Sequence, residues 1–241
     1  QPTSFNLGTM KTALIILGLS LCLPAVGADK DKPLPKDFKS LKVIAEKGDA
    51  EAQFRLASNF YYGEGVKKDY GQSFKWAFLS AAQGNPKAQY RLARLYSSGR
   101  GVLRDEKKAD ALFKESFRGL INLARQNDPK AQYNLGQMYR LNRGMEKDER
   151  EAVKWYRKAA EQGYPTNAQY NLGVMYGMGK GVEQNYVTAY AWASIAATNG
   201  NNIAPRFKSQ FLEPKMTPAQ IAKAEELVKE MVKKNPKLLN K

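Results

Sequence analysis

Small, leucine and aromatic residues recur along the chain at helical spacing, in one motif that appears four times. The four copies occupy residues 52–60, 88–96, 131–139 and 168–176. Their first residues lie 36, 43 and 37 positions apart. A period of this length predicts a solenoid of repeated helical units, in which each unit packs only on its neighbours.

Each copy predicts a first helix with one closely packing face. An alanine and a second small residue five positions later lie on this face, and a leucine and an aromatic residue continue it. The small pairs are Ala52 and Ala57, Ala88 and Ala93, Ala131 and Gly136, and Ala168 and Gly173. Because small side chains let a neighbouring helix approach closely, we expect this face to form the seam between helices.

A glycine turn and a capped second helix follow each copy. The turns are residues 63–66, 99–102, 142–145 and 179–182, and four positions after each last glycine stands Asp69, Asp105, Asp148 or Asn185. Glycine and asparagine suit the left-handed residue that ends a helix, and Asp and Asn are good N-caps. A phosphate-binding loop would end in Gly-Lys-Ser/Thr, which these turns lack. The fixed place of the acids favours capping over catalysis or metal binding.

The second helix of each unit carries alanine or serine at the fourth position after its cap and a large apolar residue at the seventh. These pairs are Ser73 and Trp76, Ala109 and Leu112, Ala152 and Trp155, and Ala189 and Trp192. We interpret the tryptophans as core between helices, with a ligand platform as the alternative. The spacing of 43 exceeds that of 36 by seven residues, about two helical turns. It predicts one protruding long helix over residues 107–125.

The pattern divides the chain into five parts. Residues 1–9 are upstream residues, 10–28 a signal peptide, 29–40 a charged tether with prolines, 41–200 the solenoid, and 201–241 a linker and basic capping helix. Within the solenoid the repeats fall at about 45–82, 83–125, 126–160 and 161–200.

Residues 10–28 have the order of a secretory signal. Met10 and Lys11 precede a short apolar run, and small residues end at Ala28, where we expect cleavage. The protein is therefore expected to be exported, either periplasmic or secreted. A lipoprotein signal using Cys22 would want a small residue before it, where Leu21 stands. An uncleaved membrane anchor is the remaining alternative.

The sequence of residues 201–241 predicts a terminal helix. Thr217 and Pro218 form a helix start, and one apolar stripe follows along residues 221–232. A solenoid needs a terminal element with one polar face, so we expect this helix to cover the last repeat. Because the helix is rich in lysine, an anionic membrane surface is the alternative.

Composition narrows the chemistry. Among 241 residues there is no histidine and a single cysteine, and the net charge is +16. The lack of histidine excludes histidine bases, histidine triads and His-ligated metals. We predict no cofactor and no metal site. The positive charge favours acidic partners, although it also serves solubility. Export and the lack of a base-reading motif argue against nucleic acid.

The repeated residues resemble the Sel-one-like repeat, a relative of the tetratricopeptide repeat. Residues 151–160, Glu-Ala-Val-Lys-Trp-Tyr-Arg-Lys-Ala-Ala, match its second helix almost position by position. The resemblance covers residues 45–200 and is weakest in the second unit. It implies an all-α, right-handed α/α solenoid of about four helix pairs. It also implies protein binding by a noncatalytic scaffold or adaptor.

A tetratricopeptide-like geometry would place the first helices on the concave side of the solenoid. Its groove would then hold an aromatic ladder with cations around the middle, able to bind an acidic peptide. The candidate residues are Phe54, Lys87, Tyr90, Arg94, Lys130, Tyr133, Gln137, Arg140 and Tyr170. Because the tyrosine belongs to the family pattern, a structural role is the alternative. An envelope enzyme, or a protein that binds peptidoglycan or another anionic polymer, is the alternative function.

Overall fold

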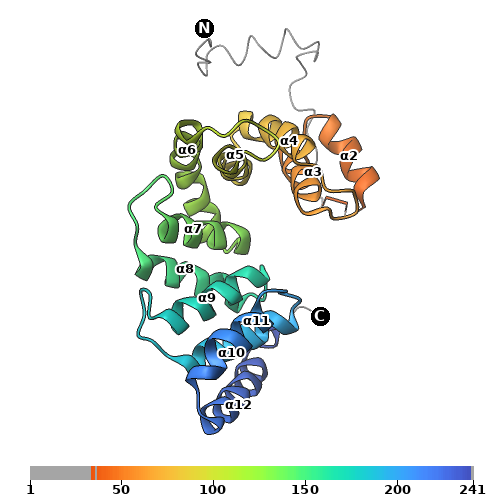
Figure 1. The fold of residues 1–241 in the computed structure, drawn as a ribbon. Helices are drawn as coiled ribbons and strands as arrows, with labels where there is room; N and C mark the ends of the chain where they lie inside the picture. The colour runs from red at the N-terminus through yellow and green to blue at the C-terminus, as the bar shows by residue number, and fades with distance from the viewer. Residues whose placement is uncertain (1–33, 36, 240–241) are drawn as a thin grey trace.

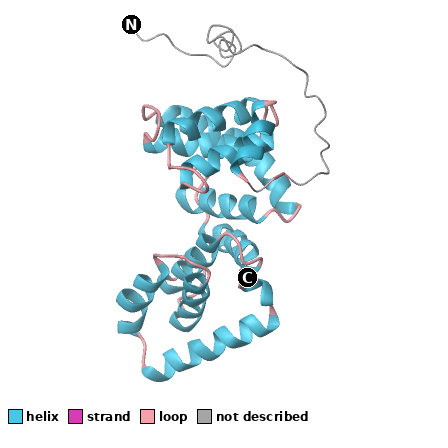
Figure 2. Ribbon diagram, turned by 90° about the vertical axis from the view of Figure 1, so that its right-hand side faces the viewer, coloured by secondary structure: helices cyan, strands magenta, loops and turns pink. Residues whose placement is uncertain are grey.

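The computed structural model describes residues 34, 35 and 37–239, and every regular element within these ranges is helical (Figures 1 and 2). The upstream residues, the signal peptide and most of the tether expected from the sequence lie outside the described residues. The first described helix begins at Phe38, inside the range expected for the tether.

Eleven α-helices and three short helical turns follow one another through the described part of the chain. The bounds are α2 Phe38–Glu46, α3 Ala50–Tyr62, α4 Tyr70–Ala82, α5 Pro86–Ser98, α6 Glu106–Arg125, α7 Pro129–Leu141, α8 Glu149–Glu161, α9 Thr166–Met178, α10 Tyr186–Thr198, α11 Ala204–Phe207, η1 Lys208–Leu212, η2 Glu213–Lys215, α12 Pro218–Lys234 and η3 Pro236–Leu238. No helix among the described residues is long and apolar enough to cross a membrane.

The helices stack in chain order into an arc, as Figure 1 shows. Four antiparallel pairs form the body: α3 with α4, α5 with α6, α7 with α8, and α9 with α10. Helix α2 covers the first pair, and α12 packs on α10 at the other end. The predicted all-α repeat solenoid is confirmed, and the small residues of the repeated motif are buried in it.

The predicted caps are present at the start of each second helix. Asp69 and Asp105 accept hydrogen bonds from the backbone N–H three residues ahead, at 2.9 and 3.0 Å. Asp148 and Asn185 do the same. Since these side chains satisfy backbone donors that a helix leaves free, their place in the sequence is explained by folding.

The last glycine of each turn contacts the preceding repeat. Gly101 and Gly181 have φ values of +72° and +68°, and a Cβ at either would overlap the first backbone carbonyl of α4 or α8. Only glycine tolerates both the left-handed backbone and this close approach. Each turn therefore sits on the second helix of the preceding repeat.

The long helix α6 shifts the register between repeats. It has 20 residues, against 13 in α4 and in α8, which confirms the predicted long helix. The glycine that follows α7, Gly144, meets α6 at Phe113, seven residues beyond the first residue of that helix. The second half of the solenoid is thereby displaced along α6 by roughly 10 Å, because each helical residue rises about 1.5 Å. Ala109 and Leu120 are both buried, so one face of this long helix packs into the stack along its length.

A glutamine inside the first, third and fourth repeated motifs forms hydrogen bonds that the sequence analysis did not anticipate, whereas the equivalent Gln89 donates to Glu115. Gln53 Nε2 donates to the carbonyl of Ala45 at 3.1 Å, and its Oε1 accepts from Gln83 at 2.8 Å. Gln132 makes the same pair of contacts, to Ala124 and Gln162. This amide joins the end of the preceding helix to the end of its own partner helix.

The two ends of the solenoid are covered. Thr217 and Gln220 form the capping box that starts α12, and Ala224 on this helix is buried. The expected capping helix is confirmed. The segment expected as a linker is helical instead: Phe207 and Leu212 pack with α10 residues in one core cluster. Apolar contact with the last repeat gives this segment its structure.

Candidate functional site

Side chains from successive repeats lie close together on one face of the solenoid. The ammonium of Lys130, at the start of α7, lies 5.5 Å from the ring centroid of Tyr164, just before α9. Tyr62, at the end of α3, is close enough to feel the charges of Arg91, Arg94 and Lys130. We call this face, formed by α3, α5, α7 and the start of α9, the concave face.

Two of the predicted groove aromatics are core residues. Phe54 is 4% exposed and packs in the core of the first repeat. Tyr90 is 2% exposed, and its ring packs edge-on against Phe113 with centroids 5.4 Å apart. Both lie beneath the concave face, because the position two before the motif leucine points into the seam with the next helix. These two aromatic residues therefore have the structural role that was the alternative to ligand binding.

The predicted residues of α7 and α9 are partly or fully buried beside the second half of the concave face. Gln137 donates its side-chain N–H to the hydroxyl of Tyr133, and Arg140 Nε donates to the hydroxyl of Tyr156 at 3.2 Å. Gln137 is buried, whereas Tyr133 and Arg140 are half-buried. Tyr170 is also half-buried. Its ring packs edge-on against Phe207, which turns it toward the C-terminal segment.

Lys87 is an ion-pair hub between repeats. Its Nζ lies 3.1 Å from a carboxylate oxygen of Glu51 and 3.4 Å from one of Asp128. The lysine side chain is 12% exposed. It links α3, α5 and the N-cap of α7, so its predicted charge serves contacts within the solenoid.

The structure adds Arg91, Tyr61, Tyr62 and Tyr164 to the predicted set of site residues. Arg91 is 8% exposed, and its guanidinium lies 4.4 Å from the ring centroid of Tyr61 and 4.9 Å from that of Tyr62. The sequence feature that could have identified Arg91 is the variable position directly before the motif leucine. This position holds Arg55, Arg91, Asn134 and Asn171 in turn. A cation there points along the concave face from α5.

Arginines and tyrosine hydroxyls form a connected layer on this face. Arg91 donates to the hydroxyl of Tyr62 at 3.3 and 3.4 Å. Arg94 and Arg100 donate to the hydroxyl of Tyr61, at 3.4 and 3.0 Å. Guanidinium groups over tyrosine rings are held there by cation–π attraction.

The electrostatics of the concave face are positive around Tyr62. Burial alone would raise the pKa of Tyr62, but the charges of Arg91, Arg94 and Lys130 outweigh it, so the pKa lies below its ordinary value. Burial, and then the charge of Lys87, lower the pKa of Lys130. Burial raises the pKa of Tyr164. A negative group entering here would meet several cations in a partly water-excluded region.

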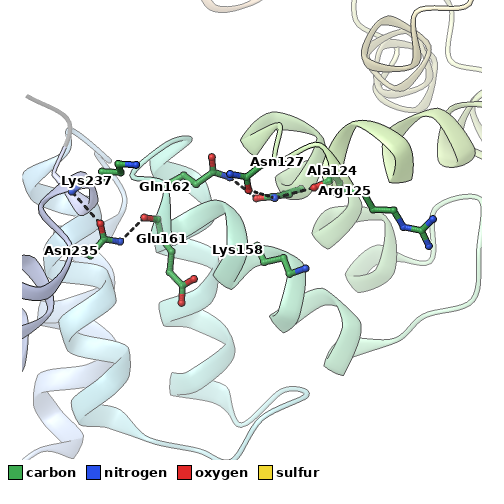
Figure 3. A pocket seen from close by; sticks show the side chains of 9 residues that line it. Ala124, Arg125, Asn127, Lys158, Glu161, Gln162, Asn235 and Lys237 are labelled. Atoms are coloured by element: carbon green, nitrogen blue, oxygen red, sulfur yellow. Dashed lines mark hydrogen bonds between the residues drawn. The ribbon is translucent and has the colours of Figure 1, made fainter.

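A hollow lies at the edge of the solenoid, away from the layer of arginines and tyrosine hydroxyls. It has a volume of about 520 Å³ and is bordered by Arg125, Lys158, Glu161 and the C-terminal residues Asn235 and Lys237 (Figure 3). Asn235 Nδ2 donates to the backbone carbonyl of Glu161 at 2.7 Å, which ties the C-terminal segment to α8. The described residues include no group of three His, Cys, Asp or Glu side chains placed to hold a metal.

These features define an α-solenoid with a basic, aromatic concave face. The Sel1 repeat model matches residues 50–85, 86–116, 129–164 and 166–201, and the chain belongs to the Sel1 repeat family. Proteins of this family generally mediate protein–protein interaction and typically serve as noncatalytic scaffolds. A comparison with curated proteins gives no match.

Several solved structures are similar to this chain. A protective antigen present in uropathogenic Escherichia coli strains is 32% identical, covers 83% of this chain and 49% of its own, with a TM-score of 0.49. A Sel1 repeat protein from Oxalobacter formigenes is 33% identical, covering 71% and 47%, with a TM-score of 0.45. An immunity protein from Pseudomonas aeruginosa is 20% identical, covering 90% and 88%, with a TM-score of 0.42. The chain spans about half the length of the first two.

Proposed function

We propose that the protein is an exported, noncatalytic scaffold that binds a protein or peptide partner on the concave face. The observation that carries this proposal is the gathering of Arg91, Arg94 and Lys130 beside Tyr62 and Tyr164 on that face. Tyrosines and arginines are the side chains that most often anchor protein interfaces. Family membership supports a protein as the partner.

The partner is expected to be acidic where it meets this face. The chain carries a net charge of +16. The nearby carboxylates of Glu51 and Asp128 are already paired with Lys87. The remaining cations therefore attract negative charge from outside the chain, which raises the association rate and favours acidic partners.

Site-specific photo-crosslinking tests the binding face. A photoreactive phenylalanine analogue replaces Tyr164, which is 44% exposed on the concave face. The same analogue replaces the exposed Lys223 on α12 as a matched control. A discrete protein crosslinked in envelope extract from position 164 and absent from position 223 supports the proposal. Equal crosslinking from both positions, or crosslinking from position 223 alone, overturns it.

Export is the second part of the proposal and rests on the signal-like sequence of residues 10–28. Expression in a Gram-negative host should give a product whose N-terminus lies near Asp29, released by osmotic shock. A full-length protein beginning at Met10 in the cytoplasmic fraction would contradict export and leave the binding face untouched.

A further inference from the structure

Three cations on the concave face make no ion pair with any carboxylate of the described residues. No Asp or Glu within the described part of the chain lies within 4.0 Å of the charged nitrogens of Arg91, Arg94 or Lys130. The carboxylates of Glu51 and Asp128 are bound to Lys87, while Glu51 and Glu64 attract Lys130 from a longer distance. Arg91 and Arg94 are therefore without a carboxylate partner in this part of the protein, and the charge of Lys130 is only partly offset.

Leaving Arg91 without a carboxylate partner is energetically costly. The residue is 8% exposed, and a buried cation is expensive unless a negative partner accompanies it. Its hydrogen bonds to Tyr62 Oη measure 3.3 and 3.4 Å. Charge-assisted bonds to a carboxylate are usually shorter, about 2.7–2.9 Å. The tyrosine hydroxyl is thus a weak substitute for an anion.

The side chain of Tyr62 has room to move away from Arg91. The residue is 47% exposed, and it stands at the end of α3, immediately before the left-handed Gly63. A rotation of its side chain would free the N–H groups of Arg91 toward the open face. The neighbouring cation of Lys130 comes from the next repeat, so an anion placed here would bridge α5 and α7.

We propose that Arg91, Arg94 and Lys130 form a carboxylate subsite for an acidic peptide segment, and that the Tyr62 hydroxyl occupies this subsite until the segment binds. This inference rests on the proposed function and specifies its ligand chemistry. Tyr164 provides an exposed ring beside the subsite, against which an apolar neighbour of the acidic residue packs. A flexible peptide can follow the inside of an arc, whereas a flat bilayer meets its rim.

A binding titration with hexaglutamate tests the subsite, with hexaglutamine as the uncharged control peptide. The protein is residues 29–241, the expected mature chain. The test variant carries Arg94→Gln with Lys130→Gln, and the control variant carries Lys233→Gln with Lys234→Gln. The control removes the same charge from exposed positions at the C-terminal end of α12, which lie outside the cluster.

We expect the test variant to bind hexaglutamate at least about tenfold more weakly, since it loses charge-assisted hydrogen bonds to the carboxylates. The control variant should retain the affinity of the unmodified protein. Tyr62→Phe should strengthen binding, because the competing hydroxyl is gone. Equal loss in both double variants would show that net charge alone acts, and weaker binding by Tyr62→Phe would overturn the role of the hydroxyl.

Further arms separate other sources of negative charge. The two probes are inorganic phosphate and vesicles of phosphatidylglycerol with phosphatidylcholine. If either probe binds more tightly than hexaglutamate, and the test variant loses that binding, the peptide assignment is overturned. Circular dichroism confirms that each variant is folded. If crosslinking from position 164 captures a partner while the test variant binds hexaglutamate normally, the subsite is wrong and the proposed function stands.

Discussion

The side-chain nitrogen Nε2 of Gln162 lies 2.8 Å from the side-chain oxygen Oε1 of Gln132, and this bond ties the two helices of the third repeat at one end. Gln132 also donates to the carbonyl of Ala124, the last turn of the preceding helix. The first repeat has the same arrangement in Gln83 and Gln53. The same amide arrangement thus connects three helix ends in the first and third repeats.

Gln132→Met should destabilise the solenoid by about 1–3 kcal/mol, because buried partners lose their hydrogen bonds while the volume is nearly kept. Gln132 is 1% exposed. Urea unfolding followed by circular dichroism measures the change. The control is Gln72→Met, an exposed position at which a surface change stays within about 0.5 kcal/mol. Equal midpoints for the two variants would mean that the buried amide contributes nothing.

Features fixed by neighbouring residues could be predicted from the sequence. The caps at Asp69 and Asp148 and the end of α3 at Gly63 depend on contacts within a few residues. The extra length of α6 followed from the spacing. The pairing of Gln53 with Gln83 joins residues 30 positions apart, so no local pattern reports it.

The concave face was less predictable because its residues meet through the curvature of the stack. Tyr62 and Tyr164 are about one hundred positions apart, yet Tyr62 influences the protonation of Tyr164. Tyr90 was expected on the surface of the groove and lies in the core. The rotation of each first helix about its axis decides which motif positions point outward, and the displacement along α6 alters which repeats face one another.

Gly181→Ala should cost substantially more stability than Gly200→Ala. Both residues have positive φ, +68° and +88°, so both alanines bear the backbone strain of about 1–2 kcal/mol. Only at Gly181 would the new Cβ overlap the carbonyl of Glu149, whereas Gly200 has nothing within 4 Å of that position. The difference between the two unfolding midpoints isolates the contact between repeats. Equal losses would contradict the stacking role of the turn.

Lys87→Met should destabilise the protein by about 1–2 kcal/mol, because it leaves Glu51 and Asp128 facing one another without their shared cation. Both carboxylates are partly open to solvent, at 37% and 25% exposure, which limits the effect. The loss should shrink as salt is added. The control is Lys108→Met, whose pair with Asp105 is more exposed. A salt-independent loss would indicate packing of the lysine stem as the cause.

Tyr156→Phe should flatten the fall of stability at alkaline pH. Burial raises the pKa of Tyr156 to about 12 from an ordinary 10.0, against the opposing charge and hydrogen bond of Arg140. The folded state therefore holds a proton that the unfolded chain has released. This contribution is complete below about pH 10 and is lost as the pH rises toward 12, with a slope of up to about 1.4 kcal/mol per pH unit.

Tyr62→Phe provides the control of opposite sign for that experiment. Three neighbouring cations hold the pKa of Tyr62 below its ordinary value, so the unfolded chain binds the extra proton and this residue adds stability as the pH rises past its folded pKa. Removing the Tyr62 hydroxyl should leave the alkaline fall at least as steep, while removing that of Tyr156 makes it shallower. Urea midpoints from neutral pH to about pH 12 decide between them. If the stability of the two variants depends on pH in the same way, the predicted difference in electrostatics between the core and the concave face is wrong.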